Sequence, residues 1–292
     1  MKREAIDKLV RPSVAGAEAR PRPSFPVKLT TAQQAPQGRS QVGAPGQGPR
    51  APAVGKPAAS APVHAGIQRP KPPERMANGT ESQAARFAMV RKLEVHGIRH
   101  AAVLAAMRQV ERHRFVDSAL ANQAYEDTSL PIGLGQTISK PSVVARMIEL
   151  LCHDRPEKLG RVLEIGTGCG YQAAVLSVVA TEVYSMERLR GLHERARENL
   201  RLLRLPNLHL LMGDGMLGFA KGAPYAAIIA AAGGNDIPQA WLDQLAVGGR
   251  LVAPTVTATG QQNLVMVDKT ARGLVRTELE AVHFVPLKSG IG

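Results

Sequence analysis

The chain contains 292 residues with a formal net charge of +13, and residues 1–80 hold 13 Lys or Arg against only 4 Asp or Glu. No apolar run in the sequence is long enough for a membrane-spanning helix. The only cysteines are Cys152 and Cys169, which are too few for a disulfide framework or a zinc cluster.

Residues 1–80 differ in composition from the rest of the chain. They contain 13 of the 21 prolines, and Phe25 is their only Phe, Tyr or Trp. Because such a segment buries too little apolar surface to offset its chain entropy, we expect a disordered, basic tail rich in Pro, Ala and Gly. Residues 81–292 have the length of one α/β domain. The chain does not begin with the apolar core of a signal peptide, so we expect a cytoplasmic protein.

Two helices are predicted at the start of this domain. The first begins at Thr80, a candidate N-cap, and is ended by Gly97. Its apolar stripe consists of Phe87, Val90, Leu93 and Val95. The second covers residues 99–110. Its inward-facing side chains are Val103, Leu104 and Met107. Together they form an N-terminal helical subregion ahead of the sheet.

Residues 124–141 interrupt the helical pattern without becoming acidic or low in complexity. A regular helix is prevented by Pro131, Gly133, Gly135 and Pro141. Structured loops with many such residues often carry function, so we expect residues 124–141 to contribute to a site. A helix over residues 142–152 follows.

A strand, a glycine turn and a helix come next. Residues 162–165 are predicted to form a buried strand, and residues 171–179 a helix. The glycines between them are Gly166, Gly168 and Gly170. A dinucleotide fingerprint needs a further glycine where this chain has Tyr171. Glu164 would repel a pyrophosphate and attract a ligand with an ammonium and a sulfonium. The pattern E-x-G-x-G-x-G therefore resembles the first motif of S-adenosylmethionine-dependent methyltransferases.

The remaining elements predict an open sheet. A strand over residues 182–186 leads to Glu187, whose carboxylate can accept hydrogen bonds from both hydroxyls of a ribose. Further strands are predicted at 208–212, 226–230 and 250–253, and helices at 189–203 and 238–245. This alternation indicates a doubly wound α/β sheet with helices on both faces. Antiparallel strands are predicted at 263–267 and 274–285, joined by a turn at 270–273, which makes the sheet mixed.

The loop at 124–141 is similar to the signature of the protein-L-isoaspartate (D-aspartate) O-methyltransferase family, A-Y-x-D-x-x-L-P-I-G-x-G-Q-T-I-S-x-P. The matching residues are Tyr125, Asp127, Leu130, Pro131, Ile132, Gly133, Gly135, Gln136, Thr137, Ile138, Ser139 and Pro141. Matches continue at residues 213–215, 223–225, 238–240, 248–251 and 284–287. The chain departs from the family pattern at Glu111, Ala226, Gly233 and Gly234. The resemblance covers roughly residues 82–290 and leaves out the tail.

This resemblance implies a Rossmann-like methyltransferase fold and an enzyme of protein repair. Such an enzyme transfers a methyl group from S-adenosylmethionine to the free α-carboxylate of L-isoaspartyl and D-aspartyl residues in damaged proteins. S-adenosylhomocysteine is the product, and no metal is implied. We expect a monomer whose partners are these damaged proteins, with no specific nucleic-acid partner and no membrane partner.

The resemblance also implies the site residues. Ser139 would be the catalytic residue, with its hydroxyl orienting the acceptor carboxylate. The implied cofactor-binding residues are Gln136, Thr137, Ile138, Glu164, Gly166, Thr167, Gly168, Gly170, Glu187, Asp214 and Gly215. The implied substrate-binding residues are Ser139, Ile138, Val285, Pro286 and Leu287.

Two other functions remain open. A methyltransferase of base amino groups usually carries Asn/Asp-Pro-Pro-Tyr/Phe after the fourth strand, where residues 230–234 here read Ala-Ala-Ala-Gly-Gly. The second alternative is a non-enzymatic scaffold whose basic tail binds nucleic acid, and the presence of Ser139, Glu164 and Glu187 argues against it. Methyl-transfer assays with an isoaspartyl peptide, an aspartyl peptide and RNA would separate the three functions.

Overall fold

A computed structural model of the chain describes residues 79–152 and 157–292. The tail expected over residues 1–80 lies outside this described part, except that Gly79 and Thr80 belong to helix α1 (Gly79–Val95). Thr80 therefore lies inside the helix instead of capping it. The chain turns at Gly97, whose φ of +99° favours glycine, as expected for the end of this helix.

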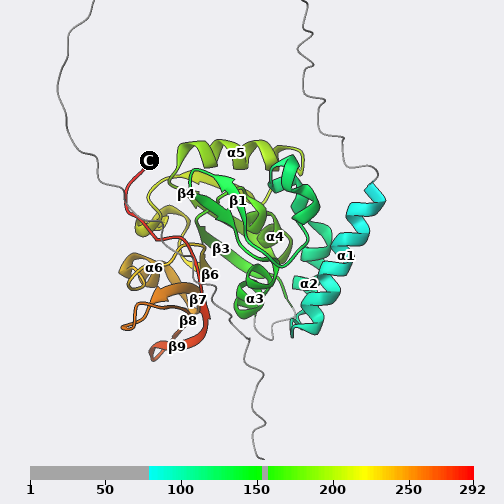
Figure 1. Cartoon of the computed structure of the whole chain (residues 1–292). Helices are drawn as coiled ribbons and strands as arrows, with labels where there is room; N and C mark the ends of the chain where they lie inside the picture. The colour runs from blue at the N-terminus through cyan, green and yellow to red at the C-terminus, as the bar shows by residue number, and fades with distance from the viewer. Residues whose placement is uncertain (1–78, 153–156) are drawn as a thin grey trace, which may run out of the picture. The chain divides into compact units, whose positions relative to one another are not determined.

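The helical subregion packs beside the sheet (Figure 1). It consists of α1, α2 (Ala101–Gln109) and two short 3₁₀ helices, η1 (Arg112–Phe115) and η2 (Ser118–Gln123). Val103 and Met107 of α2 are fully buried, because α2 lies against α1, α3 (Pro141–Cys152) and α4 (Tyr171–Val179). The predicted inward face of the second helix is confirmed at these two residues.

A mixed sheet of seven strands forms the centre of the domain, with strand order β5-β4-β3-β6-β7-β8-β9. The strands are β3 (Leu159–Ile165), β4 (Ala180–Glu187), β5 (Leu208–Met212), β6 (Tyr225–Ala230), β7 (Leu245–Val256), β8 (Gln262–Thr270) and β9 (Gly273–Val282). The pairs from β5 to β7 are parallel, and β8 and β9 are antiparallel to their neighbours. The predicted doubly wound mixed sheet is confirmed.

Helices cover both faces of the sheet. Alternate side chains of one strand enter different cores, so Val162 packs with the cluster under α2, α3, α4 and α5 (Arg190–Arg201), whereas Leu163 packs with Trp241. Trp241 belongs to α6 (Gln239–Gln244), which covers the second face together with η3 (Gly215–Leu217) and η4 (Ala220–Gly222). No helix in the described part of the chain is both long and apolar enough to cross a membrane.

Two segments differ from their predicted form. The loop at 124–141 contains an antiparallel ribbon of β1 (Leu130–Gly133) and β2 (Gln136–Ile138). These strands are too short for an alternating pattern, and the tip between them needs a positive φ at three successive residues, Gly133, Leu134 and Gly135. The last strand ends at Val282 instead of residue 285, because the following residues leave β8 and pair elsewhere.

Candidate functional site

A cavity of about 420 Å³ opens at the carboxyl ends of β3, β4 and β6, where ligands bind in open α/β sheets. It brings together most of the residues implied by the resemblance. Those that line it are Gln136, Thr137, Ile138, Ser139, Gly166, Thr167, Gly168, Glu187, Gly215, Val285, Pro286 and Leu287. Glu164, Gly170 and Asp214 do not line it.

The glycine turn forms one wall of this cavity. Gly166, Gly168 and Gly170 all have positive φ values, of 91°, 57° and 92°, which L side chains rarely adopt. A Cβ atom on Gly168 would lie 3.2 Å from Cδ1 of Ile132 in the ribbon, and one on Gly170 would lie 2.8 Å from Leu200 of α5. The turn therefore needs glycine both for its backbone conformation and for the close approach of its neighbours.

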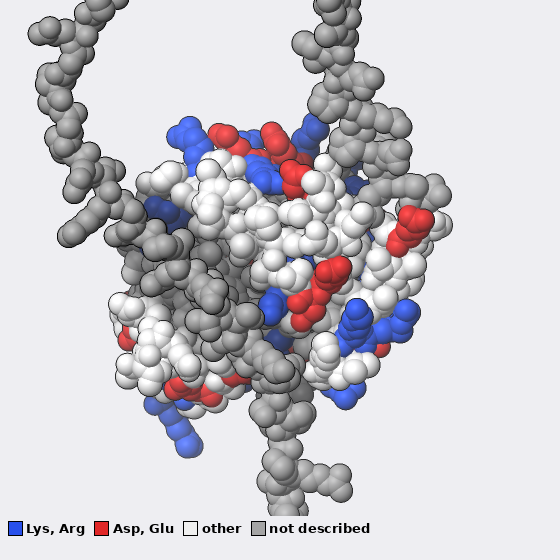
Figure 2. Space-filling view, in the orientation of Figure 1, with Lys and Arg blue, Asp and Glu red and all other residues white. Residues whose placement is uncertain are grey.

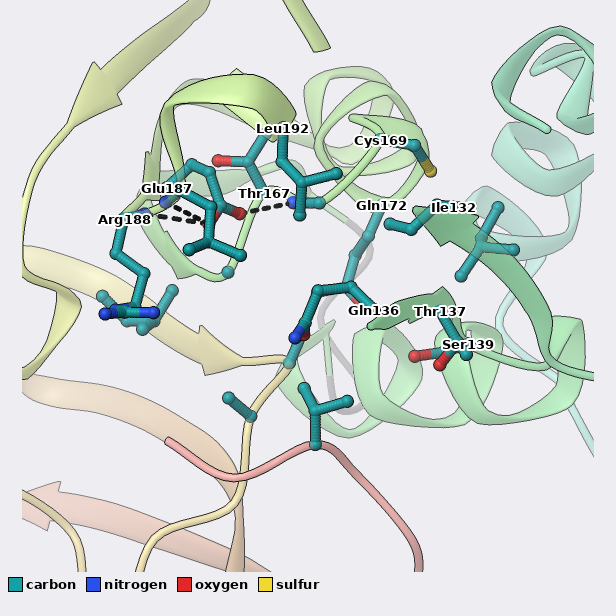
Figure 3. A pocket seen from close by; sticks show the side chains of 18 of the residues that line it. Ile132, Gln136, Thr137, Ser139, Thr167, Cys169, Gln172, Glu187, Arg188 and Leu192 are labelled. Carbon is teal, nitrogen blue, oxygen red and sulfur yellow. Dashed lines mark hydrogen bonds between the residues drawn. The ribbon is translucent and has the colours of Figure 1, made fainter. Parts of the chain in front are cut away.

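Glu187 stands at the end of β4 and is held by backbone groups. Its Oε2 atom accepts a hydrogen bond from the N–H of Gly168 at 2.9 Å, and its Oε1 atom accepts from Arg188 and Leu189, each at 2.9 Å. A carboxylate offers about four acceptor positions, so these three bonds leave room for another donor at Oε2. Figure 3 shows this carboxylate facing the cavity beside Thr167.

Gln172 is a cavity residue that the sequence reasoning did not identify. It lies in the first turn of α4 and is only 7% exposed. Its Nε2 atom makes no close hydrogen bond, and its amide interacts with the buried Glu164 carboxyl behind the cavity wall. Gln172 therefore connects the cavity wall to the Glu164 side chain. The one signal in the sequence was a glutamine within an otherwise apolar helix start.

The cavity fits an adenosine cofactor on these grounds. A glycine turn that admits a close ligand, the Glu187 carboxylate with a remaining acceptor position and the polar amide of Gln172 line the same space. The described residues contain no group of three or more His, Cys, Asp or Glu side chains that could hold a metal ion.

Glu164 lies behind the cavity wall, although its position before the turn led us to expect it beside the ligand. Its side chain is fully buried within the sheet, and its Oε2 atom accepts a short hydrogen bond from Ser185 Oγ. Ser185 Oγ also lies 2.6 Å from Oγ1 of Thr167, which does line the cavity. Burial raises the pKa of Glu164 to about 8, although the Ser185 hydroxyl and the Gln172 amide act to lower it.

Asp214 also turns away from the cavity. Its Oδ1 atom accepts from the N–H of Met216 at 2.9 Å and caps η3, and its Oδ2 atom accepts from the N–H of Gly290 at 2.7 Å. Asp214 therefore connects the end of β5 to residues 285–292. Gly170 contacts α5 behind the turn.

The opposite end of the cavity is formed by the β1–β2 ribbon. Figure 3 shows the side-chain oxygens of Thr137 and Ser139 close together there, away from Glu187. Ser139 is half-buried and its hydroxyl makes no hydrogen bond to another described residue. The start of α3 is instead bonded by Asp127, whose carboxylate accepts from Ser142 N–H and Oγ, both at 2.8 Å.

Two side chains of α5 hold the ribbon over the glycine turn. Arg195 of α5 donates to the carbonyl of Ile132 at 2.6 Å, next to the ribbon tip. Asn199 of the same helix donates to the carbonyl of Cys169 at 2.9 Å. One face of α5 therefore bonds both the ribbon and the turn.

Residues 285–287 complete the cavity beside the ribbon. Gly233 donates to the carbonyl of Val285 at 2.9 Å and accepts from the N–H of Leu287 at 2.8 Å. The amide of Gln262 bonds both the N–H and the carbonyl of Phe284, at 2.7 and 3.2 Å. A Cβ atom at Gly233 would lie 2.7 Å from Nε2 of Gln262. Glycine at this departure from the family pattern therefore makes room for Gln262.

The departures at Glu111 and Ala226 lie away from the cavity. The Glu111 carboxylate is paired with Arg86 at 3.3 Å and with Arg114. Ala226 packs against Gly160, where an added Cβ would lie 3.0 Å from the Ala226 methyl group. Neither residue lines the cavity.

The sequence alone did not identify several apolar and basic residues that line the cavity. They include Ile132, Leu134, Cys169, Tyr171, Met186, Arg188, Leu189, Leu192 and Lys288. Most are ordinary core-forming types that carry no chemical signal by themselves. Arg188 and Leu189 could have been inferred from their position directly after Glu187, at the end of a predicted strand.

Comparisons with known proteins agree on one family. The family model described as protein-L-isoaspartate(D-aspartate) O-methyltransferase matches residues 84–292. A protein-L-isoaspartate O-methyltransferase of Methylibium petroleiphilum is 55% identical over 278 residues, covering 94% of this chain and 98% of the relative. That of Leptothrix cholodnii is 62% identical over 217 residues, covering 73% and 76%.

Two solved structures are similar. A protein-L-isoaspartate O-methyltransferase is 29% identical with a TM-score of 0.64, covering 71% of this chain and 67% of that chain. A putative one from Plasmodium falciparum, in complex with S-adenosyl-L-homocysteine, has a TM-score of 0.60 at 24% identity, covering 70% and 98%. The second likeness bears on the fold alone.

Proposed function

Because the chain belongs to the protein-L-isoaspartate O-methyltransferase family, we propose that its cavity binds S-adenosylmethionine at the Glu187 end and the acceptor carboxylate at the Ser139 end. The enzyme methylates the free α-carboxylate of L-isoaspartyl and D-aspartyl residues in damaged proteins, which initiates their repair. One observation carries the proposed arrangement. A single cavity has the Glu187 carboxylate at one end and the Ser139 hydroxyl at the other, and each end is formed by a different element.

The Glu187 end of the cavity would bind and orient the cofactor. Glu187 would accept from a ribose hydroxyl at its remaining acceptor position, and the Gln172 amide would contact the cofactor. The backbone atoms of Gly166, Thr167 and Gly168 would lie against the cofactor. S-adenosylmethionine supplies a methyl group bonded to a positively charged sulfur, and it is released as S-adenosylhomocysteine.

The Ser139 end of the cavity needs no general base, because the substrate carboxylate that accepts the methyl group is already ionised at neutral pH. Its oxygen forms the new bond to the methyl carbon as the bond from that carbon to sulfur breaks. The protein must align these three atoms and exclude water, and such orientation can lower a barrier by roughly 7–11 kcal/mol at best. The Ser139 hydroxyl can orient the carboxylate without holding it as tightly as a lysine would in the ground state.

Ile138 and residues 285–287 would enclose the substrate backbone. Ile138 is buried, and Val285, Pro286 and Leu287 line the cavity beside the ribbon. These apolar groups would keep water from the reacting atoms while the polar ends hold cofactor and acceptor.

We also propose that the enzyme acts as a monomer in the cytoplasm and has no specific nucleic-acid partner. One chain lines the whole cavity, and Cys152 and Cys169 are free thiols, as a reducing compartment allows. On the face drawn in Figure 2, acidic and basic side chains of the described residues are interspersed, which does not favour a phosphate-binding surface there.

The proposed role of Ser139 is tested by Ser139→Ala. We expect kcat/KM for an isoaspartyl peptide to fall on the order of ten- to a thousand-fold, the range of one to two lost oriented bonds. The affinity for S-adenosylhomocysteine, measured by calorimetry, should stay nearly unchanged because the adenosine contacts lie at the other end.

The matched control is Ser177→Ala. Ser177 is buried in α4 and donates only to the carbonyl of Ala174, at 2.7 Å. This variant should keep wild-type kcat/KM. Full activity of Ser139→Ala with a lowered melting temperature would remove Ser139 from the acceptor site. Methylation of RNA in preference to the isoaspartyl peptide would overturn the proposed function itself.

A further inference from the structure

Arg112 is a fully buried arginine outside the cavity. It belongs to η1 and has no exposed surface, and no carboxylate in the described part of the protein forms an ion pair with it. Burial lowers the pKa of its guanidinium, although the nearby Tyr171, Cys169 and Asp127 raise it. A buried cation without a partner charge is unfavourable for stability, so its presence calls for another reason.

One edge of the guanidinium holds the chain that leads into the ribbon. Its Nε atom donates to the carbonyl of Ala124 at 2.8 Å, and Nη2 donates to the carbonyl of Thr128 at 3.4 Å. Thr128 lies two residues before β1, and β2 carries Thr137 and leads directly into Ser139. Arg112 therefore bonds the segment just before the β1–β2 ribbon, and this ribbon leads into Ser139.

The same guanidinium also contacts Tyr171, a residue of the cavity wall. The Arg112 Cζ atom lies 4.9 Å from the centre of the Tyr171 ring, within the range of a cation–π contact. Tyr171 follows Gly170 as the first residue of α4, and it lines the cavity. Phe115 of η1 packs edge-on against the same ring, with centroids 5.6 Å apart.

We propose that Arg112 is a positioning residue for methyl transfer. It fixes the start of the β1–β2 ribbon, which leads into Ser139, relative to the glycine turn. This inference rests on the proposed function of the two cavity ends. A guanidinium offers donors in a rigid fork and can contact an aromatic ring at the same time, so it can fix two elements relative to each other. A lysine ammonium is a point charge on a flexible stem and does not fix this geometry. A misplacement of about 1 Å between reacting groups can reduce a rate about a hundred-fold.

The test compares Arg112→Lys and Arg112→Met with wild type, at a temperature well below every melting temperature. We expect kcat for an isoaspartyl peptide to fall on the order of ten- to a hundred-fold in both variants. The affinity for S-adenosylhomocysteine and the KM for the peptide should each change less than about three-fold, because neither end of the cavity is removed. A purely structural role would lower the melting temperature and leave kcat unchanged.

Arg250→Met is the matched control. Arg250 donates to the carbonyl of Leu150 at 2.9 Å and pairs with Asp268 through two bonds, and it does not line the cavity. This variant should lose stability and keep kcat. Wild-type kcat in Arg112→Lys would overturn the positioning role while the proposed function stands. Failure of wild-type protein to methylate the isoaspartyl peptide would overturn both.

A second variant keeps the proposal testable if Arg112→Lys and Arg112→Met do not fold. Tyr171→Leu removes the ring but leaves the bonds of Arg112 to Ala124 and Thr128. We expect kcat to fall several-fold with cofactor affinity nearly kept. An unchanged kcat in Tyr171→Leu would overturn the proposal.

Discussion

At the scale of single residues, two glutamates near the same cavity have different surroundings. Glu187 lines the cavity and accepts three backbone hydrogen bonds. Glu164 is fully buried one strand away, and burial raises its pKa to about 8. Its carboxyl group is therefore mostly protonated at pH 7. The attraction that we expected between Glu164 and a sulfonium requires the loss of this proton.

Glu164→Gln should make the stability of the protein less dependent on pH. Between the ordinary pKa of a glutamate, about 4.3, and the folded value of about 8, the folded protein keeps a proton that the unfolded chain releases. The free energy of unfolding of wild type therefore falls as the pH rises through this window, by up to about 1.4 kcal/mol per pH unit. Glutamine has no proton to release, so this slope should be absent from the variant.

Urea unfolding between about pH 5 and pH 8, without cofactor, measures this slope. The control is Glu198→Gln on the exposed side of α5, which should keep the wild-type slope. Equal slopes for wild type and Glu164→Gln would show that the Glu164 carboxyl is ionised in the folded protein.

Residues whose role follows from the backbone were predictable from the sequence. Gly166 and Gly168 have the positive φ values that the glycine turn requires, and Glu187 lies at the strand end where it was expected. Asp214 occupies an equivalent position after β5, but its side chain turns toward Met216 and Gly290. The direction of a side chain depends on donors brought near by distant parts of the chain, and Gly290 lies 76 residues away.

At the scale of elements, residues 285–287 are positioned by two contacts that the sequence did not indicate. Gly233 bonds Val285 and Leu287 through its backbone, and the Gln262 amide bonds both polar groups of Phe284. Gln262 thereby continues the pairing of β8 with the chain after β9 has ended at Val282. Together with the bonds of Gly233, this side-chain bridge holds the segment at the cavity after β9 has ended.

Gly233→Ala should disturb this bridge. Its new Cβ would lie 2.7 Å from Gln262 Nε2, so the amide must shift and weaken its bonds to Phe284. We expect the KM for an isoaspartyl peptide to rise roughly three- to ten-fold, the effect of losing one or two neutral hydrogen bonds. Steady-state kinetics with saturating cofactor measure this change.

The double variant tests the cause of this effect. Once Gln262→Ala has removed the amide, Gly233→Ala should have little further effect on KM, because the two changes act through one contact. Additive effects on KM would show that Gly233→Ala acts through another route, and the bridge would then not position residues 285–287.

The regular elements were predicted more accurately than the segments that enclose the cavity. Apolar runs located every strand of the parallel part of the sheet, and β5 has the predicted bounds of residues 208–212. The β1–β2 ribbon was expected only as a structured loop. Strands of three or four residues do not contain enough positions for a period to be recognised, and the ribbon is held by contacts from α5 that are distant in sequence.

At the scale of the whole molecule, the family match and the composition divide the chain at nearly the same place. The family model begins at residue 84, five residues into α1. Residues 81–292 carry 24 Lys or Arg and 20 Asp or Glu, so the remaining domain has a modest charge compared with the whole chain. We propose that residues 81–292 form the methyltransferase domain and residues 1–80 an appendage.

Deletion of residues 1–78 should therefore leave both melting temperature and kcat/KM close to wild type. A segment rich in Pro, with Phe25 as its only Phe, Tyr or Trp, has little to contribute to packing. Deletion of residues 1–95 is the contrasting control, because it also removes α1 and its buried Val90 and Leu93. Each such side chain contributes about 1.5–3 kcal/mol when fully buried, so this second deletion should lower the melting temperature strongly. Calorimetric melting and methyl transfer to an isoaspartyl peptide measure both effects. A large loss in the shorter deletion would show that residues 1–78 stabilise the domain or take part in its reaction.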